Sequence, residues 1–256
     1  MVYKGWKVSV VVPCCNEEAN LPRVMQDIPG IVDEVIVVDN NSQDRTADVA
    51  RSYGAVVVHE PRQGYGAAYK AGFRRASGDY LVAMDGDGTY PARFIPVILD
   101  VMVEENLDFV SCDRSGHRVD GASALTRVLG NRVLSLVQAV LFAIRVRDSQ
   151  SGMWVLRREI LPLLNLSSDG MAFSEEIKIE AFTHPDLAAC ELPIYYRPRP
   201  GRSNLSVWRD GLRNLVFLFQ KRLALWRSVR PRRLRGSTQD GAPVALVADA
   251  GDSEKG

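Results

Sequence analysis

Residues 80–89, YLVAMDGDGT, lead from an apolar stretch directly into two aspartates that are separated by one glycine. The stretch from Tyr80 to Met84 is typical of a short buried strand. Asp85 and Asp87 therefore emerge where that strand ends, with little side-chain bulk around them. Carboxylates at positions i and i+2 are hard oxygen ligands that can hold Mg²⁺ or Mn²⁺ and leave coordination sites for a diphosphate. The segment predicts a metal and phosphate site at a strand end.

Two other interpretations apply to residues 85–89: a plain turn rich in aspartate and glycine, or a calcium loop. An EF-hand loop needs a ligand at its fifth position and a glutamate at its twelfth. Thr89 and Pro96 occupy those places, which speaks against an EF-hand. Residues 85–89 alone do not distinguish a plain turn from a metal site. The choice therefore depends on the residues at the ends of the other predicted strands.

The first 115 residues alternate between strand-like and helix-like patterns. Stretches rich in valine and isoleucine predict strands at 7–12, 34–39, 55–59, 80–85 and 108–111. Apolar residues at helical spacing predict helices at 18–28, 45–53, 66–76 and 91–105, with Pro91 at the first helical position of the last one. Strict alternation predicts an α/β fold with a mainly parallel sheet flanked by helices.

Polar residues gather where these strands end. They are Asn16 and Glu17, residues 39–41, Asp85 and Asp87, and Asp113 and Arg114. Ligands of open α/β sheets bind at the carboxyl ends of the strands. Four such groups at corresponding positions therefore favour a binding site over scattered surface polarity.

The motifs in series resemble a known family. VVVP (10–13), NEE (16–18), VVDNNS (37–42), GYGAA (64–68), GDY (78–80) and DGD (85–87) resemble the nucleotide-binding half of family 2 glycosyltransferases. DSQSG (148–152), FSEE (173–176), ELPI (191–194) and residues 197–203 are similar to the dolichol- and polyprenyl-phosphate mannosyl- and glucosyltransferases. The resemblance runs from about residue 8 to residue 214, and it implies the GT-A nucleotide-diphospho-sugar transferase fold.

The resemblance also implies roles for individual residues. The nucleotide-sugar site would contain Pro13, Cys15, Glu17, Asp39, Asn41, Gly64, Asp85, Gly86 and Arg199. The metal ligands would be Asp85, Asp87 and Thr89, and the cofactor Mg²⁺ or Mn²⁺. The catalytic residues would be Asp87, Glu176 and Arg114. Arg114 and Arg199 would face phosphates of the donor or acceptor, and Glu176 would complete the sugar side of the site.

The activity implied by the family is a single in-line displacement that inverts the anomeric carbon. A lipid-phosphate acceptor is already a nucleophile and needs no strong base, whereas a hydroxyl acceptor would need a carboxylate such as Glu176 or Glu175. The partners would be a UDP- or GDP-linked sugar and a polyprenyl or dolichyl phosphate. The alternative is a cytosolic enzyme with a soluble acceptor, such as a nucleoside or secondary metabolite. The lack of an expected membrane span and two departures from the family pattern, Cys14-Cys15 and Asn204, leave room for that alternative. A third departure, Thr89, differs from the mannosyltransferase pattern and favours a UDP-linked donor.

A third class of function is a non-catalytic nucleotide-sugar binding protein or a nucleotidyltransferase. A nucleotidyltransferase would show a glycine-rich, basic loop after its first strand, and residues 13–17 are neither. A net charge of +1 gives no reason to expect nucleic acid as a partner. No signal peptide is expected, because the apolar run 8–12 is short and leads into Pro13 and charged residues. No membrane span is expected either, because the longest apolar stretch, 133–144, is short of the roughly 20 residues that a span needs. We therefore expect a cytoplasmic protein, with the cytosolic membrane face as its place of action if the acceptor is a lipid.

The second half of the chain is less regular. It predicts helices at 123–144, 157–164 and 173–182, an edge strand at 187–196 and an amphipathic helix at 204–226. We expect one GT-A domain over 1–228, with a nucleotide-binding half (1–115) and an acceptor half (116–228), followed by a disordered tail (229–256). The apolar side of the last helix has two interpretations: it packs on the domain, or it lies on lipid.

Overall fold

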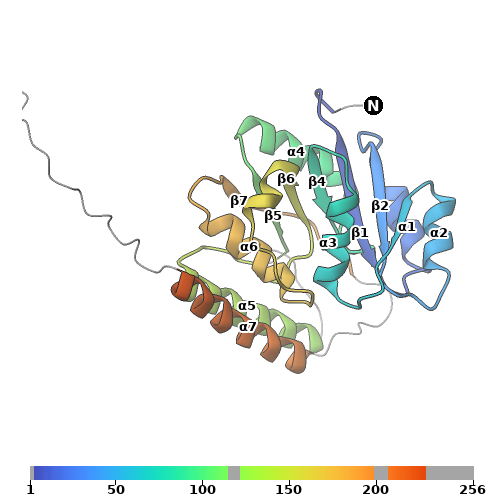
Figure 1. Cartoon of the computed structure of the whole chain (residues 1–256). Helices are drawn as coiled ribbons and strands as arrows, with labels where there is room; N and C mark the ends of the chain where they lie inside the picture. Colours follow the sequence, from blue (N-terminus) through green and yellow to red (C-terminus); the bar gives the residue numbers. More distant parts are fainter. Residues whose placement is uncertain (1–2, 115–121, 199–206, 229–256) are drawn as a thin grey trace, which may run out of the picture.

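The protein is built on one mixed sheet, seen in a computed structural model that describes residues 3–114, 122–198 and 207–228 (Figure 1). The sheet has seven strands in the order β3-β2-β1-β4-β6-β5-β7. Their bounds are β1 Val8–Cys14, β2 Glu34–Asp39, β3 Val56–His59, β4 Tyr80–Ala83, β5 Phe109–Asp113, β6 Trp154–Arg157 and β7 Ala189–Pro193. The pairs β1–β2, β1–β4, β2–β3 and β5–β7 are parallel, so the predicted mainly parallel sheet is confirmed.

Strand β6 is a feature that the sequence pattern did not predict. Residues 157–164 were expected to form a helix, but β6 occupies 154–157 and a 3-10 helix, η2 (Arg158–Leu163), follows it. The strand runs antiparallel between β4 and β5, where Trp154, Val155 and Leu156 are fully buried. Because β6 runs in reverse, it begins at the edge of the sheet where the parallel strands end. The loop before it, residues 148–153, therefore faces that edge.

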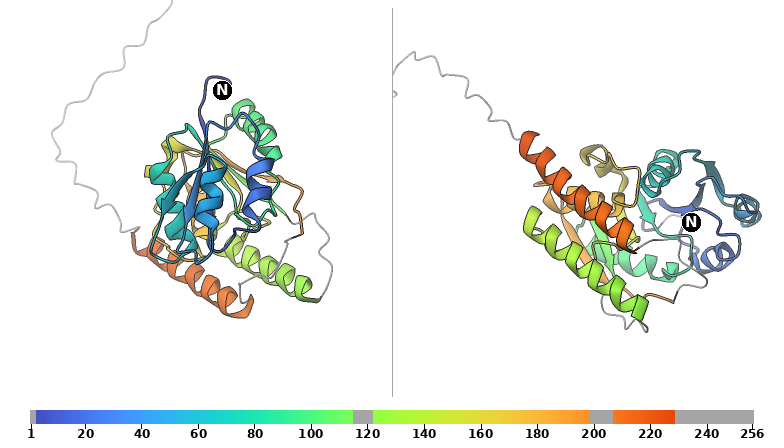
Figure 2. Two further views of the ribbon diagram at one scale, coloured as in Figure 1. Left: turned by 90° about the vertical axis from the view of Figure 1, so that its right-hand side faces the viewer. Right: turned by 90° about the horizontal axis from the view of Figure 1, so that it is seen from below.

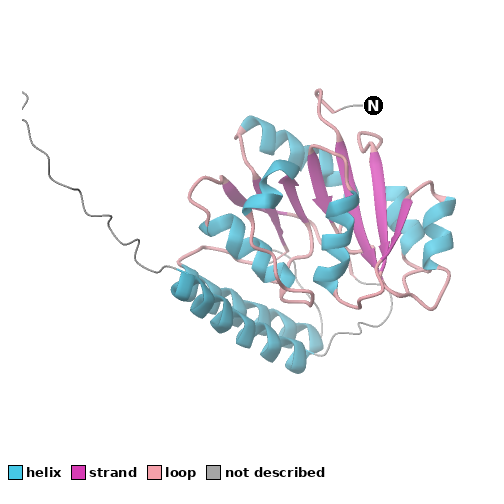
Figure 3. Cartoon of the chain, viewed as in Figure 1, coloured by secondary structure: helices cyan, strands magenta, loops and turns pink. Residues whose placement is uncertain are grey.

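Helices cover both faces of the sheet (Figures 1 and 3). On one side α1 (Leu21–Asp27), α2 (Thr46–Ser52) and α4 (Ile95–Glu104) share a buried cluster with Val8, Val10 and Val12 of β1. On the other side α3 (Tyr65–Arg75) and α6 (Phe173–Thr183) pack against Val11 and Trp154. Alternate residues of β1 thus point to opposite cores, as expected for a strand buried on both faces.

The predicted helix start at Pro91 is wrong by one turn. Pro91 has extended backbone and precedes a short 3-10 helix, η1 (Ala92–Phe94); α4 itself begins at Ile95, with Pro96 in its first turn. A proline in the first helical turn costs no hydrogen bond, so Pro91 and Pro96 could each stand at a helix start as far as the sequence shows. The edge-strand prediction is confirmed, because β7 pairs only with β5 among the described strands.

Two long helices form a separate layer below the sheet (Figure 1 and the right view of Figure 2). They are α5 (Ala122–Phe142) and α7 (Val207–Ser228), which pack on each other. Leu134 of α5 and Leu218 of α7 join Ile179 of α6 in a third buried cluster. Within the described residues, no helix combines the length and the apolar character that crossing a membrane requires.

Candidate active site

The two aspartates of the DGD segment follow β4 at the carboxyl edge of the sheet. The Tyr65 hydroxyl, at the start of α3, donates a hydrogen bond of 2.8 Å to Asp85 Oδ1. The backbone amide and hydroxyl of Thr89 donate to Asp87 Oδ1 at 3.1 and 2.6 Å. Both carboxylates are therefore oriented by neighbouring donors. Asp87 is 6 % exposed and Thr89 is fully buried, so the Thr89 hydroxyl supports Asp87 directly.

Two glycines let other segments approach these carboxylates. A Cβ at Gly86 would lie 2.5 Å from Cys14 Sγ, and a Cβ at Gly152 would lie 2.4 Å from Asp85 Oδ2 and 2.6 Å from the Tyr65 hydroxyl oxygen. No side chain fits at such distances. The loop before β6 thus reaches the first aspartate only because residue 152 is glycine.

Several carboxylates converge around Cys14 at the end of β1. Burial raises the pKa of its thiol well above the usual range, and the negative charges of Glu17, Asp39, Asp85 and Asp87 raise it further. The predicted residues Glu17, Asp39, Asp85 and Asp87 are therefore brought together in one place. Such a concentration of negative charge at a sheet edge attracts a cation.

The loops after β1 and β2 are fastened to each other. The Glu17 backbone amide donates to Thr46 Oγ1 at 2.8 Å, and Glu17 Oε2 accepts from the side-chain Nδ2 of Asn20 at 2.6 Å. Asp39 accepts the Ser42 amide at 3.0 Å and lies 3.3 Å from His59 Nδ1. These contacts hold the loop after β1 (residues 15–20) against the loop after β2, which runs into the start of α2 (residues 40–46). We call these two loops the rim. Pro13 is partly exposed there, and Cys15 is exposed.

Asn40 is a residue of this rim that the sequence reasoning did not single out. Its side-chain amide donates to the carbonyls of Glu60 and Arg62, and its Oδ1 accepts the Gly64 amide at 2.8 Å. The predicted Asn41 is exposed and has a positive φ of 65°. Asn40 and Asn41 are neighbours in the quoted VVDNNS segment, and the sequence does not show which of the two side chains is buried. In the structure Asn40 is buried and Asn41 is exposed. Gly64 also allows the approach of residue 169, because a Cβ there would lie 2.2 Å from the Asp169 carbonyl oxygen.

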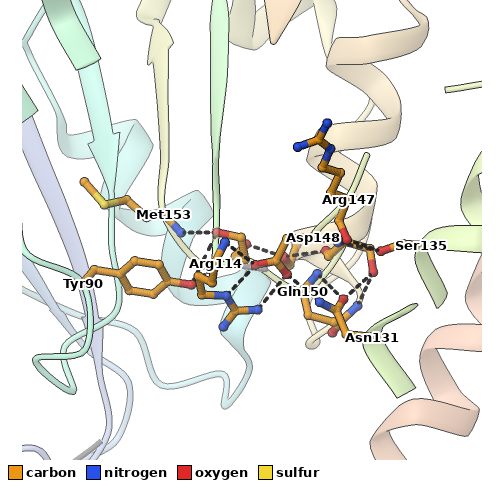
Figure 4. Close-up of polar contacts among 12 residues, drawn as sticks. Tyr90, Arg114, Asn131, Ser135, Arg147, Asp148, Gln150 and Met153 are labelled. Atoms are coloured by element: carbon orange, nitrogen blue, oxygen red, sulfur yellow. Dashed lines mark hydrogen bonds and ion pairs between the residues drawn. The ribbon is translucent and has the colours of Figure 1, made fainter. Parts of the chain in front are cut away.

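Arg114, at the end of β5, is paired with Asp148 (Figure 4). Its Nε and Nη2 donate to the two oxygens of Asp148 at 2.6 and 2.8 Å, and its backbone amide donates at 3.0 Å. The guanidinium also lies 5.1 Å from the ring centre of Tyr196. Asp148 is 1 % exposed, and the arginine holds the pKa of its carboxyl well below the usual range despite burial. The pair fixes the loop before β6 beside the aspartates.

Lys178 is a second residue that the sequence reasoning missed. It is fully buried on α6. Its Nζ donates to the carbonyl oxygens of Asp148, Ser149 and Ser151 at 3.1, 2.8 and 2.9 Å. Burial lowers the pKa of the amine to about 8. The only signal in the sequence is a lysine between two isoleucines, and that pattern fits a solvent-exposed helix position equally well.

Glu175 and Glu176 lie in the first turn of α6 and have different surroundings. Both are fully buried. Glu176 accepts from Ser167 Oγ, the Ser168 amide and Lys221 Nζ at 2.8, 2.7 and 3.0 Å, so both of its oxygens are engaged. Glu175 Oε1 accepts from Gln150 at 2.6 Å, while its Oε2 has no partner among the described residues. Burial raises the pKa of Glu175 to about 8, so this carboxyl is mostly protonated at neutral pH.

Arg199 lies outside the described residues. The structure does place the segment leading to it: the Arg197 amide donates to the Thr89 carbonyl at 2.9 Å, and the Arg197 guanidinium pairs with Asp27 at 3.0 Å. The chain before Arg199 therefore passes directly behind the DGD loop.

The donor set fits a divalent cation that is shared with a substrate. Among the residues that the structure describes, no three His, Cys, Asp or Glu side chains form a closed metal cage. Asp85 and Asp87 offer hard carboxylate oxygens, which is how Mg²⁺ is commonly held together with substrate phosphates. Asp85 and Asp87, with the predicted third ligand Thr89, would thus supply the protein ligands, and a diphosphate would supply the others.

The fold and the site define an α/β protein with an acidic centre at the carboxyl ends of its parallel strands. The sequence profile of Glycosyl transferase family 2 matches residues 9–163. A dolichyl-phosphate hexose transferase of Haloferax volcanii is 33% identical over 207 residues, which cover 80% of this chain and 89% of that protein. The chain therefore belongs to glycosyl transferase family 2 and has the GT-A fold of a transferase.

Two further likenesses extend this assignment. The low-salt glycan biosynthesis hexosyltransferase Agl6 of Haloferax volcanii is 33% identical over 218 residues; the match covers 82% of this chain but only 52% of that relative, so this chain spans about half of it. The crystal structure of glucosyl-3-phosphoglycerate synthase from Mycobacterium tuberculosis has a TM-score of 0.66 at 25% identity, covering 95% of this chain and 89% of that one.

Proposed function

We propose that the protein transfers a hexose from a nucleotide diphosphate sugar to a polyprenyl or dolichyl phosphate, with inversion at the anomeric carbon and with help from a divalent cation. The observation that carries the proposal is the oriented pair Asp85 and Asp87 beside Glu17 and Asp39, in a family 2 chain. The likeness to a dolichyl-phosphate hexose transferase supports the acceptor class.

On the donor side, we assign the nucleotide to the rim formed by the loops after β1 and β2. Asp39 would bind the base or ribose, and Pro13, Cys15, Glu17, Asn41 and Gly64 would line the rest. Asp85, Asp87 and Thr89 would hold Mg²⁺ or Mn²⁺, and Gly86 would lie against the nucleotide sugar. When bound, the cation neutralises charge on the leaving nucleoside diphosphate. The related synthase was crystallised with Mn²⁺ and UDP-glucose, which supports a divalent ion and a nucleotide sugar in such a site.

On the acceptor side, the phosphate oxyanion attacks the anomeric carbon directly. Arg114 is engaged bidentately by Asp148, so its contribution to phosphate binding would come from its remaining nitrogen and its positive charge. Arg199 would add a second cation. Glu176 already accepts three hydrogen bonds in the described structure, which favours a role in holding the acceptor side together over proton transfer.

A soluble acceptor is the second candidate, and a specific observation favours it. The synthase with the same fold was crystallised with phosphoglyceric acid, a small phosphorylated hydroxy acid. An acceptor hydroxyl needs a base. Burial raises the pKa of Glu175 to about 8, and its Oε2 accepts no hydrogen bond from the residues that the structure describes, which suits that task at slightly basic pH.

Thermal unfolding with UDP- and GDP-sugars, with and without Mn²⁺, tests the donor site. A ligand that binds only the native state at 100 times its Kd adds about 2.7 kcal/mol, which is a clear shift in Tm. We expect a metal-dependent shift with one donor, lost in Asp87→Ala. Asp48→Ala is the matched control, because that carboxylate lies on α2 with its side chain 74% exposed. A shift that survives in Asp87→Ala would refute the metal assignment.

Transfer of radiolabelled sugar then separates the two acceptor classes. The same enzyme and donor are given a short-chain polyprenyl phosphate or phosphoglycerate. We expect product only from the polyprenyl phosphate, with inverted anomeric configuration. Transfer to phosphoglycerate alone would select the second candidate, and a retained configuration would refute the single-displacement mechanism.

A further inference from the structure

The two lowest helices expose apolar side chains in two regular rows. On α5 the exposed residues recur at spacings of three and four, and so do those on α7. They are Leu129, Val133, Leu136 and Val140 on α5, and Leu212, Val216, Phe219, Leu223 and Trp226 on α7. Their exposed fractions range from 44% for Leu223 to 76% for Val140. We call these nine residues the apolar platform.

Both rows point away from the protein. The buried residues of α5, such as Leu134 and Gln138, lie on the side of that helix opposite to its exposed row. The same holds on α7, where Asn214, Leu218 and Lys221 are buried. Because both buried sides face the domain and the helices lie side by side (Figure 2, right), the two exposed rows form one outward surface. Contiguous exposed apolar surface of this kind marks an interaction site.

The charges around the platform are of one sign. Arg132 on α5 and Arg213 and Arg222 on α7 are exposed and flank the rows. The sequence contains no acidic residue from 122 to 147, and none from 211 to 239. A surface of apolar rows flanked by arginines matches the interface of an anionic bilayer, with headgroup charge outside and acyl chains beneath. A second copy of the chain would bring like charges together, which disfavours self-association through this surface.

We propose that the apolar platform of α5 and α7 is a docking surface for anionic lipid membranes. The surface is also connected to the acceptor side of the site. From α7, the Asn214 amide donates to Gln150 Oε1 at 2.9 Å, and Lys221 pairs with Glu176 at 3.0 Å. Docking would thus hold residues 148–152 and the start of α6 in fixed register with the bilayer. This consequence rests on the proposed lipid-phosphate acceptor; lipid binding itself does not.

Vesicle sedimentation, without donor or acceptor, tests the proposal. The full chain is mixed with phosphatidylcholine vesicles, alone or with about 30% phosphatidylglycerol. We expect binding to the anionic vesicles that weakens as salt is raised. In the double variant Leu136→Gln, Phe219→Gln, binding should fall about tenfold or more, because apolar insertion scales with buried area.

A matched control distinguishes the platform from exposed apolar residues in general. Val97 and Leu163 are 57% and 51% exposed, close to the 65% and 55% of Leu136 and Phe219, but lie on α4 and η2. Val97→Gln, Leu163→Gln should bind vesicles like the wild type. Three results would each overturn the proposal: no vesicle binding, equal loss in both double variants, or a wild-type dimer that the platform variant makes monomeric. Transfer to a soluble short-chain polyprenyl phosphate is measured separately, so failure of the proposed function is recognised independently.

Discussion

Single residues decide whether the acidic centre can form, and Gly152 is the sharpest case. A Cβ at residue 152 would overlap both Asp85 Oδ2 and the Tyr65 hydroxyl. We expect Gly152→Ala to displace Asp85, to abolish the metal-dependent donor shift in Tm, and to cost about 1–3 kcal/mol of stability. In Gly170→Ala the new Cβ meets nothing within 4 Å, so that variant should keep the shift. An unchanged donor shift in Gly152→Ala would show that Asp85 is not needed in its present position.

A second prediction for a single residue concerns Glu175 and the dependence of stability on pH. The folded protein raises the pKa of this carboxyl to about 8, so between its ordinary value of about 4.3 and pH 8 the folded state keeps a proton that the unfolded chain releases. The free energy of unfolding should therefore fall as pH rises through this window. Lys178 and Gln150 face the carboxyl, and the lysine amine stays largely charged below about pH 8.

The variant Glu175→Gln removes this titration and keeps the shape of the side chain. Urea unfolding should show equal stabilities for the variant and wild type near pH 4, and a variant that is more stable by a few kcal/mol near pH 8. Parallel stability curves would contradict the shifted pKa. Sugar transfer by the variant tests the acceptor class. A hydroxyl acceptor needs Glu175 as a base, so transfer to it should be lost, whereas transfer to a lipid phosphate should be kept.

Among the helices and strands, α7 is attached to α6 in part through one buried cation, Lys221. Lys221 is 6% exposed and pairs with Glu176 at 3.0 Å and Glu180 at 2.6 Å on α6. Lys221→Gln leaves two carboxylates without their cation, which typically costs about 3 kcal/mol or more. We expect hydrogen exchange to speed up first in α7. Arg222 is the next residue and is exposed, so the amides of α7 in Arg222→Gln should exchange at the wild-type rate. Equal exchange rates in both variants would show that the ion pairs of Lys221 do not hold α7 in place.

For the whole molecule, we predict that residues 1–228 form the complete folding unit. The remaining residues, 229–256, are mostly small or polar and offer no regular apolar face. A chain ending at Ser228 should therefore have the same Tm and donor affinity as the full chain. Its affinity for anionic vesicles should fall, because four arginines between 229 and 235 are removed. A lower Tm would move the domain boundary into the tail.

Much of the sheet could be predicted from the sequence because its signals are local. The segment 34–39 forms β2 with the predicted bounds, and the polar residues after β1, β2, β4 and β5 gather at one edge as expected. Valine-rich strands that alternate with helices leave few topologies, since parallel neighbours are joined by right-handed crossovers. The family and the GT-A fold followed from the motifs at those strand ends.

Other features were decided by contacts between residues far apart in the chain. Strand β6 has four residues and is recognisable only by its place between β4 and β5. In the sequence Lys178 looks like any helical lysine. Only the folded structure places its amine against three carbonyl groups of the loop before β6. The outward side of α7 likewise depends on where α5 lies. Sequence alone therefore determined the strands other than β6, their polar ends and the family, because these follow from patterns within short windows. Tertiary structure decided the place of β6, which polar groups are buried and which apolar rows stay exposed, because pairing and burial depend on the whole packed chain.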